Sequence, residues 1–324
     1  MRFALGALVV VVMVAALGVE ASHLRGGTIS WIQEEGGKVR FNYMLAWRRT
    51  SKEGGTCTDA DIDSGRLITS SSTWHCLEGC QGSYALSFVC TEQNEDSNWM
   101  IGASSFEFVV PASQPTVVSF DDCCWVKALV QRAGGLVESS QGSWSIITVL
   151  NPGVRSDTGA PNVSPVTASK PLIRLKAGCT TVWNIPVYDA DGDTVRCRYA
   201  ENGARDECGT ICGVAPYGVL DEVGLPASST SRPPWTPKAS GPWPLVIEDS
   251  VNSSLTIGSA SFAPGDALSS IPLQVLLEFE TALSCAIPIF VGVTPASGAS
   301  ITAFQGVLFE MKIDVEVAAN SASS

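Results

Sequence analysis

Hydrophobic and polar residues alternate along much of the chain with the period of two that is typical of β-strands. In residues 38–49, one face carries Val39, Phe41, Tyr43, Leu45 and Trp47, which predicts a half-buried strand. Similar runs predict strands at residues 27–33, 104–111, 116–122 and 143–151, and at 180–188, 194–200, 270–280, 287–293 and 306–317. The pattern therefore predicts a β-rich protein.

Amphipathic helical periodicity is absent after the N-terminal segment, since no stretch of about twelve residues or more shows a helical stripe. We predict an all-β fold of two tandem, disulfide-stapled β-sandwiches, immunoglobulin-like or cadherin-like. Tryptophans inside the strand-like runs are expected to pack in the cores. These are Trp31, Trp47, Trp99, Trp125, Trp144 and Trp183.

The N-terminus has the features of a secretory signal peptide, predicted at residues 1–21. Arg2 precedes an apolar run from Phe3 to Val19, and the small residue Ala21 offers a cleavage point. A second apolar stretch, at residues 271–293, is interrupted by proline and glutamate, so no membrane span is predicted. We expect a secreted, extracellular protein.

Roughly 300 residues follow this leader, which fits two domains better than one. Residues 151–171 are rich in Pro, Ser, Thr and Gly and lack hydrophobic periodicity, as interdomain connections do. The prediction is an N-terminal domain at 22–155, a linker at 156–171, a C-terminal domain at 172–318 and a disordered tail at 319–324.

The formal net charge is −12, from 32 acidic and 20 basic residues. An acidic surface repels phosphate backbones, so nucleic acid is not expected as a partner. Charged residues make up only 16% of the chain, below the roughly one quarter that is usual for soluble domains. This composition is typical of β-rich extracellular proteins.

Eleven cysteines form two groups, and in an oxidising compartment they are expected to form disulfides. The adjacent residues Cys123 and Cys124 are expected to bond to different partners. The five late cysteines leave one over, which is a free thiol or bonds to the other domain or to another chain. A zinc site at His75, Cys76 and Cys80 is disfavoured because it lacks a fourth ligand. The early group is Cys57, Cys76, Cys80, Cys90, Cys123 and Cys124; the late group is Cys179, Cys197, Cys208, Cys212 and Cys285.

Two glycosylation sequons are present, at Asn162 in N-V-S and at Asn252 in N-S-S. Residues 228–245 contain five prolines and two tryptophans, which predicts a long loop rather than a central strand. Such a loop is an insertion without function, a polyproline recognition element, or a surface on which Trp235 and Trp243 stack against sugars and which makes the domain a carbohydrate-binding module.

Enzyme chemistry has little support in the sequence, which contains only two histidines and none of the common nucleophile, zinc or phosphate motifs. A secreted hydrolase that uses a pair of carboxylates is the least favoured alternative. We therefore predict a non-enzymatic extracellular binding, adhesion or matrix protein. Its expected partners are extracellular proteins, matrix components or glycans.

Several blocks, among them "ASHLRGGTISW" at 21–31 and "IPVYDADGDTVRCRYA" at 185–200, resemble a set of secreted or cell-surface animal proteins, mostly of invertebrates. Those proteins share an S-H-F-R-G-G-T opening and an immunoglobulin-like or cadherin-like module with a D-x-D-G-D motif. The resemblance implies an extracellular protein of a kind often joined to adhesion-type modules, and it assigns no activity to particular residues. This chain departs from the pattern in its Pro- and Trp-rich insertion.

The D-A-D-G-D motif at residues 189–193 has two interpretations. In the first, Asp191 and Gly192 form the turn of a β-hairpin. In the second, calcium binds as in cadherin-type modules, and the candidate ligands are Asp189, Asp191, Asp193, Asp221 and Glu222. No cofactor is required for the predicted function, and calcium is the ion to which the motif is suited.

Overall fold

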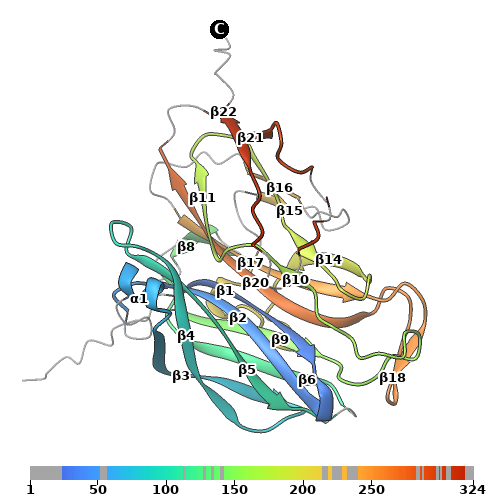
Figure 1. Cartoon of the computed structure of the whole chain (residues 1–324). Helices are drawn as coiled ribbons and strands as arrows, with labels where there is room; N and C mark the ends of the chain where they lie inside the picture. The colour runs from blue at the N-terminus through green and yellow to red at the C-terminus, as the bar shows by residue number, and fades with distance from the viewer. Residues whose placement is uncertain are drawn as a thin grey trace, which may run out of the picture.

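Figure 1 shows the chain as a computed structural model. It describes residues 24–51, 57–111, 114–126, 129–132, 135–138, 142–213, 218–220, 228–231, 240–281, 285–286, 288–296, 299, 301–303 and 308–317. The described chain is almost entirely β-structure with several disulfides, which confirms the predicted all-β, sandwich-like fold. The predicted signal peptide and C-terminal tail lie outside the described residues.

The described residues of the first half of the chain form nine strands, a short 3-10 helix and one α-helix. Thr58 caps the α-helix: its hydroxyl accepts from the backbone N–H of Asp61, whose carboxylate accepts from the N–H of Thr58. The elements are β1 (Leu24–Gln33), η1 (Glu35–Gly37), β2 (Lys38–Arg48), α1 (Asp59–Ser64), β3 (Leu67–Glu78), β4 (Ser83–Asn94), β5 (Trp99–Val109), β6 (Thr116–Cys123), β7 (Leu129–Arg132), β8 (Gly135–Glu138) and β9 (Ser143–Leu150).

The second half has shorter strands except for β17 and β20, which are the two long strands of this part. Its elements are β10 (Val166–Thr167), β11 (Leu172–Lys176), β12 (Thr181–Asn184), β13 (Val187–Tyr188), β14 (Thr194–Tyr199), η2 (Gly209–Ile211), β15 (Gly218–Leu220), β16 (Ser228–Ser231), β17 (Ser240–Ser250), β18 (Leu255–Ile257), β19 (Ala260–Phe262), β20 (Ala267–Glu280), β21 (Pro288–Val291) and β22 (Asp314–Val317).

Strands of the first half form a closed ring that is completed by β20. Neighbouring strands pair in the order β1, β2, β5, β4, β3, β6, β9 and β20. Strand β20 pairs with β9 at Ser269 and Ser270, and then with β1 at Leu273 and Gln274, all antiparallel. The β20 strand therefore closes the structure built by the first half of the chain.

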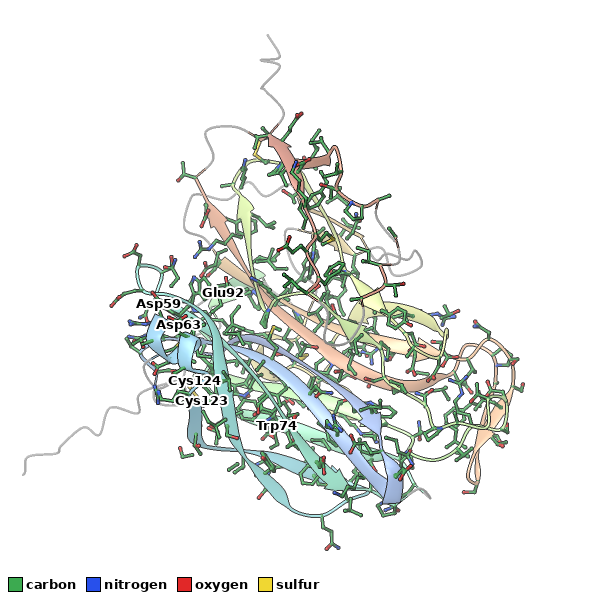
Figure 2. All side chains as sticks on the ribbon, in the orientation of Figure 1. Asp59, Asp63, Trp74, Glu92, Cys123 and Cys124 are labelled. Carbon is green, nitrogen blue, oxygen red and sulfur yellow. A yellow bond between two sulfur atoms is a disulfide. The ribbon has the colours of Figure 1, made fainter. Side chains whose placement is uncertain are left out.

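The ring encloses a core of aromatic side chains (Figure 2, where Trp74 is labelled). The ring of Trp74 packs at 5.3 Å from Phe106 and 5.0 Å from Phe120, and Trp47 packs edge-on at 5.6 Å from Trp144. The alternating face predicted for residues 38–49 points into this core, since its five apolar side chains are at most 3% exposed. Contacts of this kind stabilise the fold mainly through buried apolar area.

On its other edge, β20 pairs antiparallel with β17, which in turn pairs with β14. Near its end, β20 also pairs in parallel with β11. Strands from both sides of the predicted linker thus share one hydrogen-bonded sheet, in which the orange strand β20 runs beside the blue strand β1 (Figure 1). The boundary at residues 156–171 stays a prediction.

The R-G-G-T sequence of β1 makes the contacts that join it to β20. Arg25 is 8% exposed and forms an ion pair with Glu278 of β20. Gly26 has a φ of +150°, and a Cβ there would lie 2.3 Å from the backbone oxygen of Gln274. The motif therefore has a structural role, because only a glycine lets β1 approach β20 this closely.

The chain has five disulfides, and each joins two cysteines of the same predicted group. The early group forms Cys57–Cys90, Cys76–Cys80 and Cys123–Cys124, and the late group forms Cys179–Cys285 and Cys208–Cys212. The expectation that the adjacent cysteines bond to different partners is wrong, because Cys123 and Cys124 bond to each other at the end of β6 (Figure 2). The cysteine that remains is Cys197 on β14, which is 1% exposed. Burial raises the pKa of its thiol to about 12, so it is protonated at neutral pH.

The prediction of a long loop at residues 228–245 is wrong for residues 228–231 and 240–245, whereas residues 232–239 lie outside the described residues. Residues 228–231 form β16 and residues 240–250 form β17, which pairs with β20 along its length. Prolines are tolerated because Pro242 and Pro244 precede Leu245, the first residue of β17 that pairs with β14. Residues 240–244 pair with β20 but not with β14, so the N–H groups that the prolines lack are not needed for hydrogen bonds to β14.

Candidate functional site

The D-A-D-G-D motif is not the turn of a hairpin, which corrects the first interpretation. The flanking strands β13 and β14 do not pair with each other; β13 pairs with β10, and β14 pairs with β17. A type I′ turn needs a positive φ at both central positions. Gly192 has a φ of +78°, but the φ of Asp191 is not positive. The motif is a loop between two strands of different sheets.

Asp189 organises this loop from within. One of its carboxylate oxygens, Oδ1, accepts hydrogen bonds from the backbone N–H groups of Asp191 and Asp193, both at 3.0 Å. The residue is only 9% exposed, and its second oxygen, Oδ2, is buried without a hydrogen-bond partner. Burial raises the pKa of Asp189, and the nearby carboxylates of Asp193 and Asp191 raise it further.

The other two aspartates tie the loop to residues 155–163. The Oδ2 atom of Asp191 accepts a hydrogen bond of 2.7 Å from the backbone N–H of Val163. Both oxygens of Asp193 accept from the guanidinium of Arg155, with Nη2 to Oδ1 at 3.0 Å. This bidentate arrangement is the strongest form of an arginine–carboxylate contact.

Arg155 is the central cation of the site. Its guanidinium is 3% exposed and also donates from Nε and Nη2 to the two oxygens of Asp157, at 3.1 and 2.9 Å. Its Nη1 atom donates to Oδ1 of Asn162 at 2.8 Å and lies 3.6 Å from Oδ2 of Asp191. One guanidinium thus contacts three carboxylates and a carboxamide.

Burial lowers the pKa of Arg155, but the hydrogen bonds that its guanidinium donates to Asp193 and Asp157 outweigh this effect and hold the pKa above its ordinary value. The guanidinium is therefore charged at neutral pH. At the loop of residues 189–193, Arg155 supplies the positive charge that a calcium ion supplies in acidic loops of other proteins.

Asp249 on β17 extends the cluster into the interior, where it is fully buried. Its Oδ1 atom accepts from the backbone N–H of Ser269 at 2.7 Å and from the Ser269 hydroxyl at 2.6 Å. Its Oδ2 atom accepts from Nδ2 of Asn162 at 2.7 Å. Burial raises the pKa of Asp249 to about 7, although the hydrogen bonds from Asn162 and Ser269 act in the opposite direction.

A raised native pKa means that the folded protein holds a proton on Asp249 at pH values where the unfolded chain has lost it. The contribution of Asp249 to stability is then complete below the unfolded pKa of about 4 and is lost as the pH rises through about 7. We expect Asp249→Asn to remove a decline in unfolding free energy on the order of 1 kcal/mol between pH 6 and 8. Denaturant unfolding at several pH values measures this, and equal slopes in both proteins would contradict it.

The structure brings together three of the five calcium candidates. Asp189, Asp191 and Asp193 each offer an oxygen, and these atoms lie within 4.8 Å of one another. Asp221 and Glu222 lie outside the described residues. Calcium binding by this motif stays a prediction, and any ion there would have to share the carboxylates with Arg155.

The other predicted site residues lie in different environments. Trp243 is 1% exposed, and its Nε1 atom donates to the hydroxyl of Tyr199 at 3.3 Å, so the prediction that its ring is a sugar platform is wrong. Trp235 lies outside the described residues. Asn162 is 1% exposed and hydrogen-bonded inside the fold, whereas Asn252 is exposed and stays a predicted glycosylation site.

Zinc binding at residues 75–80 loses its thiolate ligands, since Cys76 and Cys80 form a disulfide. The side chain of His75 contacts the hydroxyl of Thr73 at 2.7 Å instead. A second group of converging ligands, Asp206, Cys208 and Cys212, is also unsuited to a metal because its two cysteines are bonded to each other.

Arg155, Asp157 and Asp249 were not predicted from the sequence. The only local signal is the R-x-D spacing of Arg155 and Asp157, inside a segment that composition marks as a connection. Asp249 follows an apolar run, and nothing in its neighbourhood indicates a buried carboxylate. Arg155 lies 38 residues from its partner Asp193, and Asp249 lies 87 residues from its partner Asn162, so only the fold brings each pair together.

Comparison with known proteins gives a relationship for the first half of the chain. Residues 25–152 match the family described as integrin beta-like protein A-E, N-terminal. Integrin beta-like protein A of Dictyostelium discoideum is 27% identical over 193 residues, or 54% of this chain, and integrin beta-like protein C is 26% identical over 174 residues, or 51%. The matched segments amount to 9% and 8% of those proteins, so this chain corresponds to less than a tenth of their length.

These relatives are not animal proteins, and the attribution to invertebrate extracellular proteins stays a prediction. No solved structure is a significant match to the chain. In the part of the chain that the structure describes, no helix has the length and apolar character needed to cross a membrane.

Proposed function

We propose that this chain is an extracellular, non-enzymatic binding protein of the adhesion type. The observation that carries the proposal is the match of residues 25–152 to the integrin beta-like N-terminal family. That region supplies the strands of the closed ring except for β20. Its loops and outer surfaces are what such a scaffold offers for recognition.

The disulfides support an extracellular location, because bonds of this kind persist in oxidising compartments and are rare in the cytosol. Secretion through the predicted signal peptide is part of the same proposal. The partners that we propose are proteins or matrix components at the cell exterior.

A cell-attachment assay tests this function. The protein is produced with its disulfides intact and coated on a surface, and attached adherent cells are counted after washing. We expect several-fold more cells than on the same protein after reduction and alkylation, which has the same composition but has lost its folded surfaces. Equal attachment to both coatings would reject the proposal.

A further inference from the structure

Exposed apolar side chains are concentrated near the C-terminal end of the described chain. Ten large hydrophobic residues between Ile289 and Val317 are exposed, whereas the other ten exposed ones are spread over residues 32–219. None of the described residues in 288–317 is buried. Monomeric soluble proteins rarely expose so much apolar surface in one place, and such surfaces are typically covered by another protein.

The hairpin of β21 and β22 carries four of the apolar residues of this segment on one face. Phe290 pairs with Val315, and Pro288 pairs with Val317, so the four side chains point to the same side of the hairpin. Phe290, Val315 and Val317 are 72%, 50% and 64% exposed. A two-stranded hairpin is at best marginally stable in water, so this apolar face requires a second layer.

The reverse face of the hairpin is acidic. It carries Glu316 and Asp314, which pair with Ile289 and Val291. The ammonium group of Lys312 lies 3.0 Å from the carboxylate of Asp314. The four residues of the apolar face, in contrast, carry no charge.

The hairpin is held in place before any partner arrives. The hydroxyl of Thr294 donates to the backbone oxygen of Asp314 at 2.9 Å and accepts from its backbone N–H at 2.7 Å. The disulfide between Cys179 and Cys285 ties the start of the segment to the end of β11. Figure 1 shows the red hairpin at one end of the molecule. A preformed surface of this kind loses little entropy on binding.

A hollow of about 760 Å³ adjoins the apolar face. Pro288 and Phe290 line it together with Ile301, Met311 and Ile313, and none of its lining residues is charged. The volume lies within the roughly 300–1,000 Å³ of typical binding pockets, so the hollow has room for several side chains of a partner. The face and the hollow form one continuous apolar surface, because they share two residues.

The apolar area is large enough for a stable dimer. A fully buried Val, Leu, Ile, Phe or Met side chain removes roughly 60–120 Å² from water. At the observed exposures, the ten apolar residues of the segment present on the order of 500 Å². A standard interface buries about 800 Å² per partner, of which about 57%, or roughly 450 Å², is apolar.

Charge favours a second copy of this chain as the occupant. With a net charge of −12, two copies repel each other wherever their acidic surfaces meet. The apolar face and the hollow are free of charge, and the acids of the hairpin lie on the reverse face. A basic partner protein would be drawn to that reverse face and would leave the apolar face uncovered.

We propose that residues 288–317 form the contact between two copies of this chain. The apolar faces of two β21–β22 hairpins pack against each other about a two-fold axis, as two layers roughly 10 Å apart. The acidic reverse faces then point away from the interface. This assignment goes beyond the proposed function and does not depend on it.

Sedimentation velocity of the full secreted chain tests the assignment over about 1–100 μM, a range that covers micromolar dissociation constants. We expect the wild-type protein to sediment as a dimer at the upper end of this range. In Phe290→Asp/Val317→Asp the dimer should be lost, because each copy then places two carboxylates in an apolar contact. A wild-type protein that stays monomeric at every concentration would overturn the assignment.

The matched control is Val109→Asp/Tyr188→Asp, which adds the same charge at two residues that are 68% and 66% exposed and lie outside residues 288–317. We expect this variant to dimerise as the wild-type protein does. Equal loss of the dimer in both double variants would show that added charge, rather than the apolar face, controls association. Wild-type species larger than a dimer would contradict the two-fold arrangement.

Amide hydrogen exchange of the wild-type protein locates the contact without any substitution. On concentration from the monomer to the dimer, we expect exchange to slow in residues 288–291 and 314–317, and to stay unchanged in β13, which contains Tyr188. A dimer in which the hairpin is not protected would place the interface elsewhere and reject the assignment. Cell attachment is scored separately, so its outcome does not bear on the dimer contact.

Discussion

Arg155→Gln should lower the unfolding free energy by about 3–5 kcal/mol, which corresponds to a fall in Tm of roughly 6–20 °C. The substitution removes the one guanidinium that contacts Asp157, Asp191 and Asp193. The side chain of Asp193 is only 6% exposed, so water cannot replace the lost partner. Removing one member of a buried ion pair is costly because the charges that remain are buried without compensation.

The matched control for this substitution is Arg40→Gln, the same chemical change at an exposed ion pair with Glu34. The two side chains of that pair are 46% and 26% exposed, and exposed pairs contribute only about 0–1 kcal/mol. Thermal unfolding of both variants in the same buffer measures the difference. Similar losses in the two variants would show that the guanidinium of Arg155 is not the central cation of the site.

Calcium extends the same experiment. In Arg155→Gln, the oxygen atoms of Asp189, Asp191 and Asp193 remain close together and lack their protein cation. With a Kd on the order of 1 mM, 10 mM calcium would restore about 1.4 kcal/mol. We expect calcium to raise the Tm of the variant more than that of the wild-type protein, and equal shifts would argue that the ion and Arg155 occupy different places.

Gly26→Ala should destabilise the protein by more than about 3 kcal/mol. The new Cβ would lie 2.3 Å from the backbone oxygen of Gln274 and 2.7 Å from that of Pro171, and neither atom can move without shifting a strand or its flanking segment. The φ of +150° adds strain for any residue other than glycine. Because Gly26 lies where β1 meets β20, the expected result is loss of the closure between these strands.

Denaturant unfolding and amide hydrogen exchange of β20 measure the effect of Gly26→Ala. Gly36→Ala is the control, since Gly36 also has a positive φ, +74°, but no atom lies within 4 Å of the position that its Cβ would take. That variant should lose only the backbone preference, about 1–2 kcal/mol. If both variants unfold alike, the close approach of β1 to β20 is not what requires glycine at position 26.

The sequence predicted the strands that bury one face, and it failed where the fold overrides a local preference. Residues 38–49 alternate because β2 has one face in the aromatic core, so period two was enough to place them. Residues 240–245 contain two prolines and were predicted as part of a loop, yet they belong to β17. Pairing with β14 begins only after the second proline, and a sequence cannot show where a neighbouring strand begins.

The candidate site shows the same limit for charges. The three aspartates of residues 189–193 were recognised from their spacing, but their partner was not, because Arg155 lies in a segment without periodicity and 38 residues away. Asp249 was missed because an acidic residue at the end of an apolar run is usually exposed. Long-range ion pairs depend on the three-dimensional arrangement of segments, and composition carries no information about that arrangement.

The closure of the ring by β20 bears on how the protein is made. During synthesis, β1 and β9 leave the ribosome well before residues 267–280. Their backbone edges therefore lack the hydrogen-bonding partner β20 until that strand has been synthesised. A fragment that ends at residue 152, where the family match ends, would keep those edges exposed. The polypeptide therefore commits to its native topology only after most of its length has left the ribosome, and contacts of such high sequence separation favour slow folding.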